Sequence, residues 1–230
     1  MNIVCIPGWG MKAGVFAPLL DSLSLSGNVT AVEWKGIETI HCFRKRAEQA
    51  LQERAAVIGW SLGSLVALEL AHAYPERVSR LILIGGTSRF VAEDGYEAGW
   101  HPRIVKRMKT QLQARSADTI AAFLASLWSK SEEGDISAFF YCDRVDELLI
   151  GLDYLVEADA RPFLPDISAP MLVVHGEQDV ICPPAAARYI AERAPNATMA
   201  LLPDTGHVPF WTQTETCVHL IQTWVGETDD

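Results

Sequence analysis

The amino-acid sequence predicts an α/β fold built on a mostly parallel sheet. Short apolar runs alternate along the chain with segments of helical periodicity. The runs are continuously apolar and rich in β-branched residues, as strands are when helices cover both faces of a sheet. The chain has 230 residues, of which 49% are hydrophobic and 21% charged. It is therefore long enough to bury a substantial core within one large domain.

The predicted elements follow one another in a regular order. Six apolar runs are predicted strands, at residues 2–6, 28–34, 54–60, 80–86, 170–176 and 198–203. Five segments with helical periodicity are predicted helices, at residues 13–25, 39–53, 62–74, 184–194 and 212–225. This alternation indicates repeated strand–helix–strand units, in which consecutive strands lie parallel.

The alternation fails once, over residues 87–165. This stretch contains no convincing strand, only helical patterns rich in bulky residues such as Phe123 and Trp128. About eighty residues are too many for a connecting loop. We therefore expect a helical cap (lid) at residues 87–165, inserted into a core that comprises residues 1–86 and 166–230.

Composition limits the partners and the compartment. The net charge of −10 and the pI of about 5.0 argue against a nucleic-acid partner, since phosphate binding needs a basic surface. No run approaches the roughly 20 apolar residues that span a bilayer, and the first ten residues lack the pattern of a signal peptide. The five cysteines are scattered without a C-x-x-C pair, as is typical of reduced thiols. We therefore expect a cytoplasmic protein that contacts no membrane. A monomer is also expected, and composition does not bear on it.

The strand at 54–60 runs into the helix at 62–74 through Gly59-Trp60-Ser61-Leu62-Gly63, a G-x-S-x-G pattern. In such a turn the serine is held in a strained conformation, and the positions two before and two after it lie against neighbouring backbone, so that both must be glycine. The turn raises the serine hydroxyl above the sheet edge, where the following helix N-terminus favours negative charge. Ser61 is therefore a candidate nucleophile. The alternative is an ordinary strand-to-helix turn.

A serine nucleophile needs a base that is oriented by a third group, and in this kind of sheet the chain order is serine, acid, histidine. Asp179 follows the strand at 170–176, and His207 follows the strand at 198–203. Taken singly, each side chain could be a turn residue or a solvated group. Their joint order, each at the carboxyl end of a strand, favours a triad with Ser61. Weaker candidates are His72, His101, His175 and His219 for the base, and Asp153 and Asp204 for the acid.

The tetrahedral intermediate of an acyl transfer needs hydrogen-bond donors for its oxyanion. One predicted donor is the backbone N–H of Leu62, directly after the nucleophile. The other is the backbone N–H of Trp9 in the loop after the first strand, where Gly8 and Gly10 permit a tight turn. The Trp9 indole can anchor the core at the same time. This chemistry calls for no metal ion and no organic cofactor.

Three motifs carry a resemblance to a known family: Gly8-Trp9-Gly10, Gly59-Trp60-Ser61-Leu62-Gly63 and Gly206-His207-Val208-Pro209-Phe210. They resemble the α/β-hydrolase superfamily over nearly the whole chain. Within it, the sequence is most similar to the pimeloyl-[acyl-carrier protein] methyl ester esterases of biotin synthesis. The resemblance implies an α/β-hydrolase fold and a serine carboxylesterase that works through an acyl-enzyme.

The sequence departs from that family pattern in three places. Pro7 stands where the superfamily usually has histidine, at a position that supports the turn rather than reacts. The chain begins directly with a buried strand, so we expect about six strands without the usual N-terminal hairpin. The arginines that the family carries just before its Phe-Leu-Ala cap motif are absent from residues 116–122.

The same resemblance implies which residues contact the acyl chain. The Phe-Leu-Ala motif corresponds to the stretch FLASL within the predicted cap. The implied substrate-binding residues are Trp9, Leu62, Phe123, Leu124, Ala125, Ser126, Leu127 and His207.

An acyl-carrier protein is highly acidic, so this acidic chain needs a local basic patch to attract it. Residues 101–115 contain no acid. The candidate docking residues within them are Arg103, Lys106, Arg107, Lys109 and Arg115. Ile104, Met108 and Leu112 recur at helical spacing and predict an inward apolar face. A solvated helix face without a partner is the alternative.

The predicted function is hydrolysis of the methyl ester of pimeloyl-acyl-carrier protein. A general short-chain carboxylesterase or thioesterase, or a carbon–carbon bond hydrolase of the same superfamily, is the alternative, because the acyl pocket rather than the triad decides the substrate. A haloalkane dehalogenase is disfavoured, since its nucleophile is aspartate. A non-catalytic ligand-binding protein of the same fold is a remote alternative, because the predicted triad is complete.

Overall fold

The centre of the fold is a six-stranded sheet in which every pair of neighbouring strands is parallel. The computed structural model describes residues 2–23 and 27–228. In chain order the strands are β1 (Asn2–Ile6), β2 (Val29–Ala31), β3 (Ala55–Trp60), β4 (Val78–Ile84), β5 (Met171–Gly176) and β6 (Ala197–Leu202). Their order across the sheet is β2-β1-β3-β4-β5-β6. The predicted six-stranded α/β fold is confirmed.

The strand register brings several loops to one edge of the sheet. The last residue of β1, Ile6, pairs with Gly59 of β3, and Trp60 pairs with Ile84 at the end of β4. Because the strands are parallel, the loops that follow β1, β3, β5 and β6 all leave from this carboxyl edge. The predicted catalytic residues lie in these loops.

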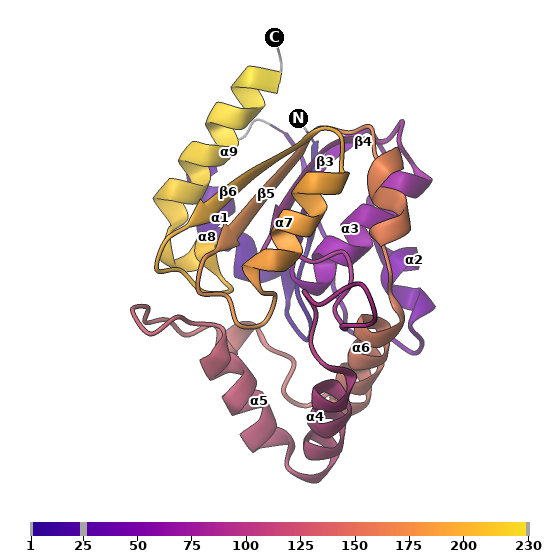
Figure 1. Ribbon diagram of the computed structural model, residues 1–230, viewed down its shortest axis with the longest axis vertical. Coiled ribbons are helices and arrows are strands. Elements are labelled where there is room, and N and C mark those ends of the chain that lie inside the picture. The colour runs from indigo at the N-terminus through magenta and orange to yellow at the C-terminus, as the bar shows by residue number, and fades with distance from the viewer. Residues whose placement is uncertain (1, 24–26, 229–230) are drawn as a thin grey trace.

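Helices cover both faces of the sheet (Figure 1). One face carries α1 (Ala17–Leu23), α8 (Pro209–Thr212) and α9 (Thr214–Thr228), with the short 3-10 helix η1 (Ala13–Phe16) ahead of α1. The other face carries α2 (His41–Ala50), α3 (Leu62–Ala73) and α7 (Pro184–Arg193). This two-sided cover explains why every residue of β3 and of β5 is buried.

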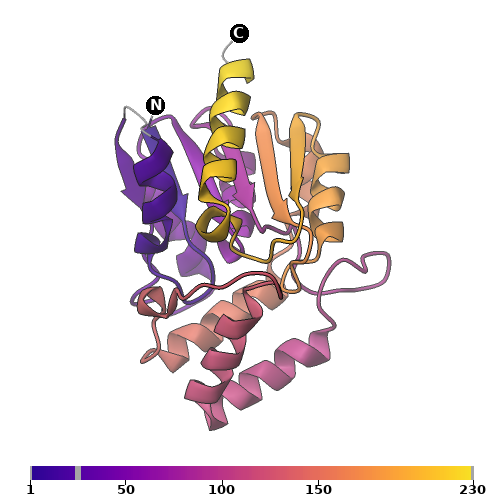
Figure 2. The same cartoon turned by 90° about the vertical axis from the view of Figure 1, so that its left-hand side faces the viewer.

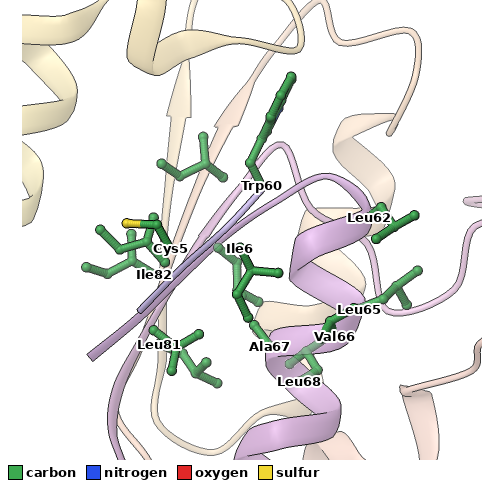
Figure 3. Close-up of a cluster of buried hydrophobic side chains, with 14 of the residues drawn as sticks. Cys5, Ile6, Trp60, Leu62, Leu65, Val66, Ala67, Leu68, Leu81 and Ile82 are labelled. Carbon is green, nitrogen blue, oxygen red and sulfur yellow. The ribbon is translucent and has the colours of Figure 1, made fainter. Parts of the chain in front are cut away.

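A cluster of buried apolar side chains lies where β3 passes into α3 (Figure 3). All six residues of β3 are buried, as are Leu65 and Val66 in the first turns of α3. On the adjacent strand β1, Ile6 lies on the α3 side of the sheet and Cys5 lies on the opposite side (Figure 3), as the alternation of a strand requires. A continuous apolar strand therefore supplies side chains to both halves of the core.

Residues 87–165 are here named the helical segment, and their three longest helices lie below the carboxyl edge of the sheet (Figures 1 and 2). They contain α4 (Pro102–Ala114), α5 (Ser116–Ser126), η2 (Ser137–Phe139) and α6 (Val145–Glu157), and η3 (Arg161–Asp166) leads back to the core. Between β4 and β5, all within the described range, only isolated bridges are formed and no strand. The division into a core and a cap at these boundaries stays a prediction.

Two chemical features concern the whole described chain. Across residues 2–23 and 27–228, no helix is both long enough and apolar enough to cross a membrane. All five cysteines are free, and Cys5, Cys182 and Cys217 are buried.

Some predicted boundaries differ from the observed ones. The strand predicted at 28–34 forms only over Val29–Ala31, where all three residues are exposed, because this edge strand pairs with β1 alone. The helix predicted at 212–225 is two helices, since the chain leaves helical geometry at Gln213. The helix predicted at 13–25 begins as 3-10 turns, and its last two positions lie outside the described residues.

Candidate active site

The turn between β3 and α3 holds Ser61 in a strained conformation. Its φ of 55° and ψ of −120° lie in a region that residues with a Cβ rarely adopt. Among the described residues other than glycine, only Ser61 and Asp204 have a positive φ. The Ser61 residue is 7% exposed and stands at the N-terminus of α3, so the helix dipole favours negative charge next to it.

The two glycines that flank Ser61 are required by close backbone contacts. A Cβ on Gly63 would lie 2.0 Å from the carbonyl oxygen of Ile6, and one on Gly59 would lie 2.6 Å from the carbonyl oxygen of Gly63. Both distances are far shorter than any contact a real Cβ makes. The G-x-S-x-G pattern therefore packs the start of α3 directly against the end of β1.

Asp179 and His207 form a buried hydrogen-bonded pair. The Asp179 Oδ2 atom lies 2.7 Å from His207 Nδ1, and the two residues are 3% and 0% exposed. The other carboxylate oxygen, Oδ1, accepts the backbone N–H groups of Ile181 at 2.8 Å and Cys182 at 2.9 Å. These bonds orient the carboxylate, so that Nδ1 of His207 carries the proton it donates and Nε2 is left as the basic nitrogen.

The neighbour of Ser61 holds the backbone of His207. The indole nitrogen of Trp60 donates to the carbonyl oxygen of His207 at 2.9 Å, and the two rings are 5.7 Å apart. His207 Nε2 is buried and makes no hydrogen bond within the described part of the chain. The structure thus brings the loops of Ser61, Asp179 and His207 together at the carboxyl edge of the sheet.

The two predicted oxyanion donors lie on either side of the same turn. A Cβ on Gly8 would be 3.3 Å from the Cβ of Ser61, so the loop that contains Trp9 runs directly against the serine. Within residues 2–23 and 27–228, the backbone N–H groups of Trp9 and Leu62 donate to no protein group. Gly10, with φ of 67°, completes the turn. Two backbone donors are therefore available beside Ser61.

Aromatic side chains from the helical segment cover this turn. The Trp9 ring packs edge-on against Phe123 at 4.8 Å and Phe140 at 5.5 Å, and its indole nitrogen donates to the carbonyl oxygen of Leu148 at 2.8 Å. The indole of Trp9 thus has its own acceptor, and its backbone N–H is not needed for this contact. Sequence reasoning missed Phe140, which carries no motif.

Comparison with known proteins gives the family. A sequence model described as alpha/beta hydrolase fold matches residues 38–214. The chain belongs to the α/β-hydrolase family. This confirms the family predicted from the three motifs.

Two curated relatives of this α/β-hydrolase carry the same name. The pimeloyl-[acyl-carrier protein] methyl ester esterase of Aromatoleum aromaticum is 30% identical over 96% of this chain and 96% of its own length. That of Vibrio atlanticus is 29% identical over 96% and 93%. The predicted likeness to this esterase family is confirmed.

A solved structure shows the same fold. An esterase from Exiguobacterium antarcticum superposes with a TM-score of 0.85 over 98% of this chain and 92% of its own. Its sequence identity is 20%, so this similarity concerns the architecture of the α/β-hydrolase alone.

The five predicted cap residues of this α/β-hydrolase do not share one surface. Phe123 faces Trp9, and Leu127 is buried beside the histidine loop, where its carbonyl oxygen accepts the N–H of His207 at 2.8 Å. Leu124 and Ala125 line an open groove of about 410 Å³ with Trp128 and Glu132, and Ala125 is exposed. The Ser126 hydroxyl donates back to the carbonyl oxygen of Phe123 at 2.6 Å. One face of α5 therefore reaches the turn and the other does not.

Two of the weaker histidine candidates have other partners. His175 is fully buried, and burial lowers its pKa. Its Nε2 donates to the carbonyl oxygen of Cys182 at 2.6 Å and lies 3.4 Å from Asp179 Oδ2, so it supports the loop of the acid. His72 stacks on Phe163 at 4.3 Å.

Some polar features lie outside the Ser61 neighbourhood. A groove of about 610 Å³ between α2, α3 and α6 is lined by Arg44, Glu69 and Tyr154 among others, and contains neither Ser61, Asp179 nor His207. Within the described chain, no three histidine, cysteine or acidic residues cluster as metal ligands would.

The predicted apolar face of α4 is wrong at one position. Ile104 is 50% exposed, whereas Val105 and Leu112 are buried and Met108 is half-buried. The inward face therefore follows i, i+3, i+7 from Val105, a spacing that also fits a helix. Because Ile104 and Val105 are adjacent and both apolar, the sequence allows the inward face to start at either residue, and packing in the folded chain buries Val105.

The basic residues of α4 are mostly exposed. Arg103, Lys106, Arg107 and Arg115 are exposed, whereas Lys109 forms an ion pair with Asp153 of α6. Four of the five predicted docking residues are therefore presented to solvent, and the fifth helps to hold α4 on α6.

Proposed function

We propose that this protein hydrolyses the methyl ester of pimeloyl-acyl-carrier protein through a Ser61–His207–Asp179 triad. At the coarser level, the family and the names of the relatives identify a carboxylic ester hydrolase. The triad, the acyl-enzyme and the carrier-bound substrate are our proposal. A cytoplasmic location and a monomeric state stay predictions.

The observation that carries the proposal is the buried Asp179–His207 pair next to a strained serine turn. The 2.7 Å contact between Oδ2 and Nδ1 fixes the imidazole with Nε2 unprotonated. Burial of both groups keeps their interaction strong, because water does not screen it. Trp60 ties the loop of this imidazole to the residue that precedes Ser61.

The mechanism follows from these groups. His207 takes the proton of Ser61 as the hydroxyl attacks the ester carbonyl, and the N–H groups of Trp9 and Leu62 bind the oxyanion. His207 then gives the proton to the departing methanol. Water, deprotonated by His207, attacks the acyl-enzyme and releases the free acid, and Asp179 stabilises the imidazolium formed in each step.

The substrate assignment is supported by the relatives and by charge. The named relatives act on a carrier-linked methyl ester, and a carrier of acidic character is attracted by a basic surface. On a chain of net charge −10, the exposed basic residues of α4 provide such a surface within the helical segment. We propose Arg103, Lys106, Arg107 and Arg115 as docking residues, and Phe123 and Leu127 as residues that contact the acyl chain.

Two measurements test the proposed triad. Ser61→Ala is expected to abolish hydrolysis of p-nitrophenyl esters, a loss of at least about 10⁴-fold, while circular dichroism and melting temperature stay as in the wild type. A fluorophosphonate probe should label the wild type and not the variant. Undiminished ester turnover by a folded Ser61→Ala protein would contradict the triad.

A genetic test addresses the substrate. Expression of the wild type should restore growth of a biotin auxotroph that lacks its own methyl ester esterase. Failure of a well-expressed protein that hydrolyses small esters would favour a general carboxylesterase instead.

A further inference from the structure

The loop that carries His207 is held by the helical segment as well as by the core. The backbone N–H of His207 donates to the carbonyl oxygen of Leu127, directly after α5, at 2.8 Å. The hydroxyls of Ser129 and Ser131 donate to the carbonyl oxygen of Asp204 at 2.7 and 2.9 Å. Residues that are remote in sequence therefore form a continuous contact between the end of α5 and the histidine loop.

One carboxylate stands at the centre of this contact. Glu132 Oε2 accepts the backbone N–H of Gly206 at 2.7 Å and that of Ser129 at 2.8 Å, and Oε1 accepts the hydroxyl of Thr212. Gly206 directly precedes His207, and Thr212 ends α8, which follows it. Glu132 therefore binds the chain on both sides of the histidine. Hydrogen bonds to an ionised acceptor are about twice as strong as neutral ones.

The sequence of the loop fits this close approach. A Cβ on Gly206 would lie 2.6 Å from the carbonyl oxygen of Leu127, 2.7 Å from the nitrogen of Ser129 and 2.8 Å from Glu132 Oε2. Only glycine permits the backbone of the helical segment and that of the histidine loop to meet here. On the opposite side, a Cβ on Gly85 would lie 2.9 Å from the carbonyl oxygen of His207. The loop is thus enclosed between the core and the helical segment.

We infer that Glu132 is a positioning residue for His207, through which the docked helical segment fixes the place of the catalytic imidazole. This inference rests on the proposed role of His207 as the base. Glu132 does not contact the reacting atoms; it acts through the N–H of Gly206 and the hydroxyl of Thr212. Asp179 and Trp60 orient the imidazole and the carbonyl of His207 from the core, and Glu132 completes this support from the other side.

The expected effect is on turnover rather than on substrate binding. His207 is the base in both acylation and deacylation, so a displaced imidazole slows the two steps together and leaves KM nearly unchanged. A displacement of about 1 Å costs roughly 100-fold in rate. Glu132→Ala should therefore lower kcat for p-nitrophenyl esters by about 10- to 100-fold.

Two milder substitutions should each lower kcat by less than Glu132→Ala does. Glu132→Gln keeps an oxygen that can accept from Gly206 and an amide that can donate to Thr212, so its kcat should fall between those of the wild type and Glu132→Ala. Thr212→Val removes one bond and leaves the carboxylate, and should lower kcat by less than Glu132→Ala does. The matched control is Glu133→Ala, because the neighbouring carboxylate is exposed and should leave kcat at the wild-type value.

The test measures kcat and KM of these variants at a temperature at which thermal melting shows each to be fully folded. A graded loss of kcat at constant KM supports the inference. A lowered melting temperature with full kcat for Glu132→Ala would show a purely structural contact and overturn it. If Glu132→Ala does not fold, wild-type kcat in folded Glu132→Gln and Thr212→Val overturns it as well. Activity retained in Ser61→Ala would instead refute the proposed function, so the two failures are distinct.

Discussion

The turn at Ser61 and the helical segment are held in place by different kinds of contact. At the turn, the backbone of β1 lies where a Cβ of Gly63 would stand, 2.0 Å from the Ile6 oxygen. In the helical segment, α4 has 13 residues, of which only Val105 and Leu112 are buried. The turn is fixed by backbone contacts that admit no side chain, whereas α4 is attached by a few side chains and leaves its surface to solvent.

The two ends of the helical segment are joined by charged side chains. Arg161 pairs with Asp159 at 2.7 Å and with Glu93, and Arg89 pairs with Glu93 at 2.8 Å and Asp159 at 3.5 Å. Tyr96 lies under the Arg161 guanidinium at 5.0 Å. Each partly exposed ion pair contributes little to the free energy of unfolding. The junction formed by Arg89, Glu93, Asp159 and Arg161 should therefore open under conditions that leave the turn at Ser61 intact. The rigid turn at Ser61 and the less firmly held helical segment are thus separate parts of one chain.

The largest expected effect is at the turn. Gly63→Ala places a methyl group into the backbone of β1, which cannot move aside cheaply, and should cost about 3 kcal/mol or more of unfolding free energy together with the esterase activity. Urea unfolding and ester turnover measure both. Gly226→Ala in α9 is the control, since nothing lies within 4 Å of the added Cβ, and it should change stability by no more than about 1 kcal/mol. A Gly63→Ala protein as stable and active as the wild type would show that the turn is not fixed by these backbone contacts.

An intermediate, pH-dependent effect is expected at the junction. Bonds from Arg161 hold the pKa of Glu93 below its ordinary value. Burial alone would raise the pKa of Asp159, but its bonds with Arg161 outweigh burial and lower it. Carboxylates with lowered pKa values stabilise the fold above the ordinary pKa of about 4, and this stabilisation is lost as the pH falls through the lower folded values.

Arg161→Gln should therefore lower the melting temperature by a few degrees at neutral pH and flatten its fall between about pH 5 and pH 3. Melting curves over a pH series give the slope. Arg103→Gln, which removes an exposed cation from α4, should keep the wild-type slope. Parallel curves for Arg161→Gln and the wild type would mean that these charges do not stabilise the junction.

The smallest structural effect is expected on the surface of α4. The double variant Lys106→Glu with Arg107→Glu should leave the melting temperature and the turnover of small esters unchanged, because both side chains are exposed. It should raise KM for a carrier-bound substrate several-fold at low salt and less at high salt, since salt screens the attraction. An unchanged KM at low ionic strength would leave α4 as an ordinary solvated face.

The sequence predicted what depends on local patterns. The sequence predicted the strands and their order because each strand appears as a run of apolar residues. It predicted the G-x-S-x-G turn because the two glycines are required by close backbone contacts around the serine. The placement of Asp179 and His207 in loops after consecutive strands followed from the same topology. The extent of β2 did not, because an edge strand has a single neighbour and only Val29–Ala31 pair with β1.

What escaped prediction depends on contacts between distant side chains. Glu132 lies in a run of polar residues with no motif, and its partners, Gly206 and Thr212, are more than seventy residues away. The inward face of α4 was misassigned because Ile104 and Val105 are both apolar, and only packing in the folded chain buries Val105 and exposes Ile104. The Trp60 indole bond to His207 likewise appears only once the two loops meet.

The most direct test of the central claim uses the proposed substrate itself. Purified methyl pimeloyl-acyl-carrier protein is incubated with the wild type and with Ser61→Ala, and intact-protein mass spectrometry follows the loss of the methyl group. The proposed triad requires rapid conversion to the free acid by the wild type and none by Ser61→Ala. An intact carrier-bound ester after incubation with a wild-type protein that hydrolyses small esters would contradict the proposed function.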